Sequence, residues 1–226
     1  MRSSREHRAV AECVNQITSL LQQLRKSEGS YHPEFKRHAE MRLATMARDL
    51  TELTQVTLSF HATESWRTVY ERVLSQCKTR RYLSVALLRT DNYWRDLPGQ
   101  ASLEFNFKLI EHGFSVQRTF IIDPFFWPPS AKTPSAGLLR WIMSQQHKDV
   151  TSRLVRLAEL DEESDLVGDF GIYGSDAVGK QTVDFEGKTQ SYEISFDADR
   201  MREAEERWER LLLYSVLVDD LLNGES

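Results

Sequence analysis

The sequence predicts an α/β protein built on a mixed, largely parallel sheet that is flanked by helices. From residue 55 onward, apolar runs of strand length alternate with helical patterns, and this order builds parallel strands joined by right-handed crossovers. After residue 169, short strands separated by glycine turns are typical of an antiparallel meander. Before residue 55, apolar residues recur every three or four positions, which predicts helices. We therefore expect two domains, residues 1–54 and residues 55–226.

The first domain is expected to be an antiparallel helical hairpin. Two apolar stripes at helical spacing are joined by Ser27-Glu28-Gly29-Ser30, which is a turn signal. Pro33 opens the second helix, where its missing N–H costs nothing. The stripe residues are Val10, Val14, Ile17, Leu21 and Leu24, then Phe35, Ala39, Leu43, Met46, Leu50 and Leu53. Each stripe is wider than one partner helix requires, so the arm is expected to mediate self-association or to dock a protein partner.

The α/β domain is expected to begin with a strand and to end with a long helix. The first strand is predicted at residues 55–60, and Thr63 is a candidate cap for the helix that follows. The other elements are expected as strands at residues 82–88, 116–122, 152–157, 170–173, 181–185 and 191–196, and as helices at residues 101–112 and 138–146. Asp197 is expected to cap the long C-terminal helix, residues 199–222.

The composition is that of a globular protein without an overall affinity for anions. The formal net charge is −5 and the pI is about 5.7, so no general positive field attracts nucleic acid, and nucleic acid is not expected as a partner. Two cysteines, Cys13 and Cys77, are too few for a disulfide framework, and no apolar stretch is long enough to span a membrane. Without a secretory signal pattern, the chain is expected in the cytoplasm, with no membrane partner.

Two motifs that suggest nucleotide chemistry lack the context that this chemistry requires. Residues 174–180 have the glycine and lysine spacing of a phosphate-binding loop, but Gln181 stands where a hydroxyl would hold Mg²⁺, and a strand-like stretch follows instead of a helix. Asp169-Phe170-Gly171 lacks the other kinase signatures. The six histidines show no metal-ligand spacing. We therefore expect ordinary turns at both motifs, and neither a metal nor a cofactor.

Polar and aromatic side chains collect where the parallel strands are predicted to end. In open α/β sheets, ligands bind outside the carboxyl ends of the strands, and arginines beside aromatic rings suit an anionic or flat ligand. The candidate ligand-binding residues are Arg89, Asp91, Trp94, Arg95, Arg118, Arg156, Asp169 and Tyr173. The alternative is structural, with Arg118 and Arg156 paired to aspartates and the aromatic rings capping the sheet. The sequence pattern alone allows both a ligand-binding role and a structural role for these residues.

Several short stretches, taken in order along the chain, resemble the phospholipase-D-like fold of bacterial regulatory modules. They are Arg80-Arg81-Tyr82, Tyr93-Trp94, Glu111-His112-Gly113 with the strand at residues 116–122, residues 169–173, and Arg207-Trp208-Glu209-Arg210-Leu211, and they cover roughly residues 55–215. Active members of that superfamily use a His-x-Lys-x4-Asp motif, with histidine as the nucleophile and lysine holding phosphate. No histidine here is followed by lysine two positions later. The resemblance therefore implies a catalytically silent version that senses a ligand or binds a partner.

Together these observations favour a non-catalytic binding or regulatory module over an enzyme. Its expected partners are a protein or a second copy, bound through the helical arm, and an anionic small ligand at the strand ends. One alternative is an enzyme that acts on a phosphodiester or a nucleotide with a non-standard site. Another is a nucleic-acid-associated regulator that uses the mildly basic arm. Turnover of phosphodiesters would favour the first alternative, and DNA binding with a steep salt dependence would favour the second.

Overall fold

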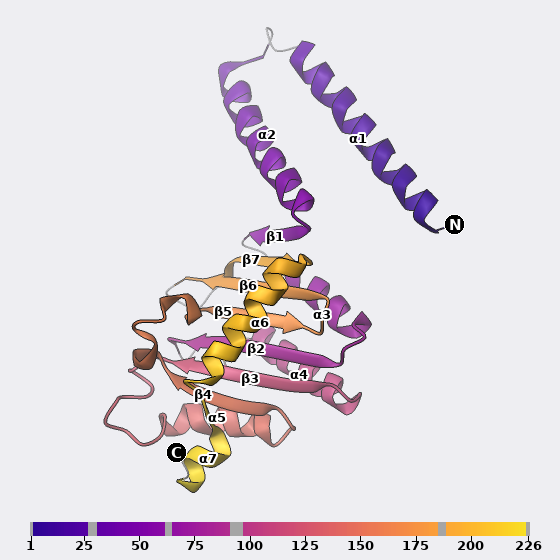
Figure 1. Cartoon of the computed structure of the whole chain (residues 1–226). Helices are drawn as coiled ribbons and strands as arrows, with labels where there is room; N and C mark the ends of the chain where they lie inside the picture. The colour runs from indigo at the N-terminus through magenta and orange to yellow at the C-terminus, as the bar shows by residue number, and fades with distance from the viewer. Residues whose placement is uncertain (1, 27–30, 62–64, 91–96, 185–188, 225–226) are drawn as a thin grey trace. The chain divides into compact units, whose positions relative to one another are not determined.

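In the computed structural model, the described residues are 2–26, 31–61, 65–90, 97–184 and 189–224 (Figure 1). By their contacts, the residues fall into two compact units, Met1–Thr51 and Glu52–Ser226. The separate folding of residues 1–54 and 55–226 remains a prediction.

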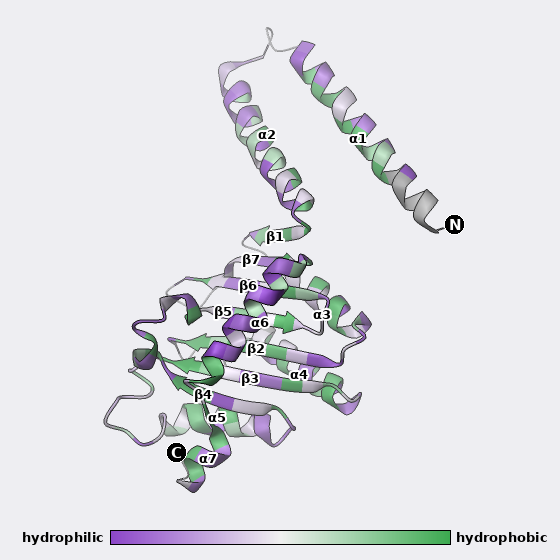
Figure 2. Ribbon diagram, in the orientation of Figure 1, coloured by the Kyte–Doolittle hydropathy of each residue, from purple (hydrophilic) through white to green (hydrophobic). Residues whose placement is uncertain are grey.

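Two amphipathic helices lie at the start of the chain. Helix α1 spans Arg2–Lys26 and helix α2 spans Pro33–Thr54, where the sequence predicts helices. Hydrophobic and hydrophilic residues alternate along both helices (Figure 2). Stripe residues of α2 are largely exposed, with 48% of Phe35 and 47% of Leu50 accessible. The packing of α1 and α2 as an antiparallel hairpin, and any assembly through them, remain predictions.

The rest of the chain forms an α/β structure. Its helices are α3 (Trp66–Gln76), α4 (Leu97–Glu111), α5 (Ala136–Gln146), α6 (Ala198–Leu212) and α7 (Val218–Asn223), with 3-10 turns η3 (Leu157–Leu160) and η4 (Ser164–Leu166). Its strands are β1 (Thr57–His61), β2 (Arg81–Leu88), β3 (Ser115–Ile122), β4 (Thr151–Arg156), β5 (Asp169–Tyr173), β6 (Ala177–Val183), β7 (Thr189–Ser195) and β8 (Val216–Leu217). The strands form one open mixed sheet, which confirms the α/β class.

The expectation of a largely parallel sheet is wrong. The strand order is β1-β7-β6-β5-β2-β3-β4-β8. Within the described sheet, only the β2–β3 and β3–β4 pairs are parallel, and the other neighbouring pairs are antiparallel. Strands β5, β6 and β7 are joined by short connections, which allow antiparallel but not parallel pairing. This meander inserts between β1 and β2, which follow each other in the sequence.

Helices cover both faces of the sheet. In Figure 1, α6 crosses one face, while α3 and α4 lie on the other. Because side chains alternate along a strand, β2 contributes Tyr82, Ala86 and Leu88 to the core beneath α3, α4 and α5, and Leu83, Val85 and Leu87 to the core beneath α6. Burial on both faces explains why β2 appears in the sequence as a continuous apolar run.

The predicted long C-terminal helix is interrupted. Helix α6 begins as expected, because the Asp197 side chain accepts hydrogen bonds from the backbone N–H groups of Asp199 and Arg200. It ends at Leu212, and the chain then forms β8, which pairs antiparallel with β4. Strand β8 supplies partners for backbone groups at the edge of β4 that would otherwise lack them. The edge of the sheet therefore decides where α6 ends.

Neither of the two nucleotide-like motifs forms a phosphate cradle. Gly174 adopts a φ of +60°, in the left-handed region that glycine tolerates, and turns the chain from β5 into the antiparallel strand β6. Asp169 is the first residue of β5. Of the turn expected at residues 174–180, residues 174–176 form the turn and residues 177–180 belong to β6. The turn expected at Asp169-Phe170-Gly171 is wrong, because these three residues lie within β5.

Candidate functional site

Three of the predicted site residues lie at the same end of the sheet, the end at which β2 and β4 finish. Arg89 directly follows β2, Arg156 is the last residue of β4, and Asp169 is the first residue of β5. Because β5 runs antiparallel to β2, its first residue lies at this end. The other candidates from the loop after β2, which are Asp91, Trp94 and Arg95, fall outside the described residues.

Tyr173 lies at the opposite end of β5. The register pairs it with Tyr82 near the start of β2. Its hydroxyl forms a hydrogen bond with the hydroxyl of Tyr192 in the interior, and burial raises the pKa of Tyr173 well above its usual value. Tyr173 is thus part of a neutral, buried cluster of tyrosines and is separated from Asp169 by the length of the strand. The sequence analysis grouped these two residues at one site, although the strand between them holds them apart.

Arg118 lies in the interior beneath α5, away from this end of the sheet. Only 6% of the residue is exposed, and its Nη1 donates to Oε1 of Gln145 at 2.7 Å. Its neighbours on the adjacent strands are Ser84 and Ser152, and its Nε has no hydrogen-bond partner in the described chain. The aspartate that one alternative assigned to Arg118 is replaced by a neutral amide.

Arg156 forms hydrogen bonds with the loop between β3 and α5. Its Nη1 and Nη2 each donate at 2.7 Å, to the carbonyl oxygens of Pro128 and Ala131. Its guanidinium lies 4.0 Å from the centre of the Trp127 ring, and its Nε lies 3.6 Å from Glu159. The hydrogen bonds and the ion pair of Arg156 are all made within the protein, which agrees with a structural role rather than ligand binding. Its main partners are carbonyl groups and not the aspartates that the sequence analysis named.

Asp169 is the chemically distinctive residue at this end of the sheet. Only 6% of it is exposed, and its Oδ1 accepts a hydrogen bond at 2.9 Å from the backbone N–H of Leu87. Burial raises the pKa of Asp169 to about 7, although the Leu87 hydrogen bond and the charges of Arg89 and Arg207 oppose the rise. Asp169 therefore changes its charge near neutral pH, which is a property that functional carboxylates often have.

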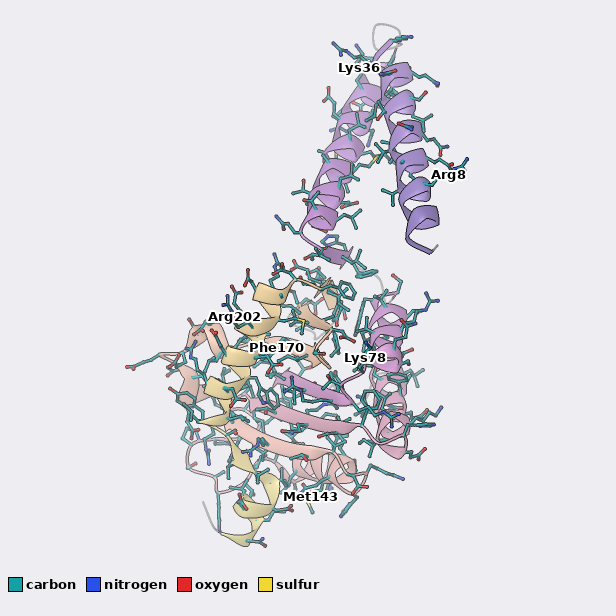
Figure 3. The ribbon with its side chains drawn as sticks, turned by 45° about the vertical axis from the view of Figure 1, so that its right-hand side comes forward. Arg8, Lys36, Lys78, Met143, Phe170 and Arg202 are labelled. Atoms are coloured by element: carbon teal, nitrogen blue, oxygen red, sulfur yellow. The ribbon has the colours of Figure 1, made fainter. Side chains whose placement is uncertain are left out.

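A cavity of about 450 Å³ lies on the α6 face of the sheet, between α6 and strands β5–β7. It is lined by Phe170, Val178, Lys180, Glu193, Ser195, Arg200, Glu203, Ala204 and Arg207. The guanidinium of Arg207 lies 4.4 Å from the centre of the Phe170 ring. Burial lowers the pKa of Arg207, and the acidic groups of Asp165 and Asp169 oppose this. Phe170, labelled in Figure 3, belongs to the core beneath α6. The cavity therefore adjoins the Asp169 end of the sheet through Phe170 and Arg207.

The sequence analysis missed the cationic residues of this cavity. Arg207 lies three positions after Ala204 and four before Leu211, so it shares the core-facing stripe of α6 with apolar residues. An arginine at that spacing is the signal that could have revealed it. Lys180 belongs to the motif that was rejected as a phosphate-binding loop, and its side chain lines this cavity instead.

Two further searches of the described residues were negative. No group of three or more His, Cys, Asp or Glu side chains is arranged there to hold a metal ion. In the same part of the chain, no helix combines the length and the apolar character needed to cross a membrane.

Comparison with known proteins finds similar folds but no sequence relatives. No family model matches the chain, and no curated protein matches it. One similar solved structure is TrmBL2, an archaeal chromatin protein with a novel mode of DNA binding (11% identity, TM-score 0.45, 91% of this chain and 69% of that chain). A second is Nuc from Salmonella typhimurium, a phospholipase D family member (10% identity, TM-score 0.48, 71% of this chain and 96% of that chain). A third is NucT from Helicobacter pylori (11% identity, TM-score 0.46, 71% of this chain and 98% of that chain).

These neighbours correct one expectation. The negative net charge led us to expect no nucleic-acid partner, and the presence of a DNA-binding protein among the neighbours contradicts this. Net charge describes the average field of a chain, whereas binding depends on where its cations lie. A phospholipase D family member among the neighbours agrees with the resemblance at the level of the fold. Because all three TM-scores are below 0.5, no property of these neighbours is assigned to this chain.

Proposed function

We propose that this protein is a nucleic-acid-associated regulator that binds through its N-terminal helices and has no phosphodiesterase activity. The separation of charge along the chain supports this proposal. Residues 1–51 contain nine Lys or Arg and six Asp or Glu, a net charge of +3, and since the whole chain carries −5, residues 52–226 carry −8. Phosphate repels the acidic part, so phosphate contacts are expected to concentrate on the basic helices.

Exposed cations on α1 and α2 are available for such contacts. Arg25 and Lys26 end α1, Arg42 lies within α2, and all three side chains are exposed. None of them forms an ion pair with a described residue, whereas Arg8, labelled in Figure 3, pairs with Glu12 at 3.0 Å. A cation that no carboxylate already neutralises contributes most to phosphate binding, because its contact releases a counterion from the nucleic acid.

Removing these three charges is expected to weaken DNA binding and its salt dependence. In the triple variant Arg25→Gln, Lys26→Gln, Arg42→Gln, the slope of log K against log salt should become smaller by about 2 to 3, because each lost phosphate contact removes about 0.9. Fluorescence anisotropy of a short labelled duplex, measured between about 50 and 200 mM salt, gives this slope.

A matched control removes three exposed cations from the acidic part of the chain. Lys132→Gln, Arg140→Gln and Lys148→Gln alter the net charge by the same amount, and all three residues are exposed. This control should keep the slope of the parent protein apart from a small general effect. Equal losses in the two triple variants, or no binding by the parent, would rule out the helices as the nucleic-acid site.

The protein is expected not to hydrolyse phosphodiesters. No histidine has a lysine two positions later, so the nucleophile and the phosphate-holding cation of the resembling superfamily are not combined. Bis(p-nitrophenyl) phosphate and labelled DNA should both remain intact with purified protein, at the level of a heat-inactivated sample. Turnover above that level which follows the protein through gel filtration would instead support an enzyme with a non-standard site.

A further inference from the structure

The cavity between α6 and strands β5–β7 holds two cations, Lys180 and Arg207, that form no ion pair within the described part of the chain. The side chain of Arg207 forms no hydrogen bond or ion pair with any described residue, and its Nε is shielded from solvent. Lys180 has Glu193 as its neighbour on β7, but the Glu193 carboxylate lies 3.8 Å from Arg200. No ion pair of Lys180 with a described residue is present. A shielded guanidinium nitrogen without an acceptor is costly, because it loses water and gains nothing in exchange.

The two cations reach the same space from different walls. Arg207 comes from α6 and Lys180 from β6, and both line the cavity. Phe170 lies opposite Lys180 across β5 and β6, and the Arg207 guanidinium stacks over its ring. Stacking holds the planar fork in one orientation, which reduces the entropy lost when an anion binds. The site therefore combines two positive groups with an apolar wall.

The volume and charge of the cavity suit a small organic anion. About 450 Å³ is within the usual range of small-molecule sites. Glu193 and Arg200 neutralise each other as an ion pair. Among the other lining residues, Glu203 carries a negative charge, and Lys180 and Arg207 carry positive charges. The Ser195 hydroxyl is already hydrogen-bonded to Thr57. The lining thus keeps an excess positive charge, held by groups that can bind an oxyanion.

We infer that this cavity binds a small organic molecule that carries a phosphate or carboxylate group. Arg207 binds two oxygen atoms of that group through its fork, as guanidinium groups do with planar or tetrahedral oxyanions. Lys180 supplies the second positive charge, and Phe170 and Val178 contact the apolar part of the molecule. This inference is independent of the proposed nucleic-acid binding, because it concerns residues on the acidic part of the chain.

Thermal unfolding with phenyl phosphate, inorganic phosphate and benzoate tests the inference on the full-length protein. Chloride at equal ionic strength is the reference. Phenyl phosphate should raise the melting temperature more than inorganic phosphate, because it also contacts the apolar wall. A larger shift with benzoate would identify the carboxylate as the preferred group. Titration calorimetry with the best probe should show binding at least about tenfold weaker in Arg207→Met and in Lys180→Met.

Arg202→Met is the matched control on the same helix. Arg202, labelled in Figure 3, is exposed on α6 and pairs with Asp199 at 3.0 Å outside the cavity. This variant should bind the probe like the parent. If Arg207→Met fails to fold, Lys180→Met decides the question, because Lys180 is exposed. An unchanged melting temperature of the parent with all three probes would overturn the inference, as would equal affinity in the parent and Lys180→Met.

Discussion

The variant Asp169→Asn is expected to be more stable than the parent protein above neutral pH and equally stable near pH 4. Burial raises the pKa of Asp169 from 3.8 to about 7. Folding therefore favours the protonated carboxyl group. The contribution of Asp169 to the free energy of unfolding is complete below pH 3.8 and is lost as the pH rises to about 7. The difference of about 3 pKa units corresponds to about 4 kcal/mol. Asn keeps an oxygen for the Leu87 N–H but cannot ionise, so the variant avoids this loss.

Urea unfolding of both proteins from about pH 4 to pH 8 measures the effect. Asp165→Asn is a control with the opposite sign, because hydrogen bonds from Arg210 lower the pKa of Asp165. That variant should lose stability relative to the parent at neutral pH, and the difference should disappear in acid. If Asp169→Asn were less stable than the parent at pH 8, Asp169 would have to be an anion held by Arg89 and Arg207.

Replacing Gln145 with leucine is expected to lower the free energy of unfolding by about 3 kcal/mol, because it leaves a buried guanidinium without its acceptor. Gln145 accepts the side-chain hydrogen bond of Arg118 at 2.7 Å, and only 1% of Gln145 is exposed. The double variant Arg118→Met, Gln145→Leu removes both polar groups and should recover the stability of the parent or exceed it. Replacing a buried charged group together with its hydrogen-bond partner by apolar residues of similar volume is often neutral or stabilising.

A double-mutant cycle measured by urea unfolding isolates the coupling. Gln146→Leu, one position further along α5, is the matched control, since Gln146 is partly buried and forms no hydrogen bond with Arg118. Its effect should add to that of Arg118→Met. Additive effects of Gln145→Leu and Arg118→Met would show that the observed hydrogen bond contributes nothing, and a large stabilisation by Gln145→Leu alone would contradict the burial of the charge.

Local patterns along the chain were sufficient to predict most elements of the fold. The helical spacing in α1 and α2, the apolar run of β2 and the Asp197 cap each depend on residues close together in sequence. Such patterns reflect the periods of 3.6 and 2 residues that any helix or half-buried strand must satisfy. They carry no information about which strands become neighbours, and the expected parallel sheet was wrong for that reason.

The candidate site depends more strongly on tertiary contacts. Asp169 and Tyr173 are the first and last residues of β5 and so lie at its opposite ends, and the antiparallel pairing with β2 places Asp169, not Tyr173, where β2 ends. The acceptor of Arg118 is on α5, 27 positions along the chain. Lys180 and Arg207 share a cavity because α6 packs over the meander. None of these pairings follows from spacing in the sequence.

The sequence by itself determined the α/β class, the helices before residue 55 and the fact that no histidine is followed by lysine two positions later, because each depends on residue identity and short-range period alone. Only the tertiary structure decided the order and direction of the strands, the end of α6 at the edge of β4, the pKa of Asp169 and the cavity beside it. All four features depend on which surfaces of the chain pack together and lose their contact with water. That outcome is a property of the packed chain as a whole, so a buried carboxylate and an unpaired guanidinium cannot be recognised before the packing is known.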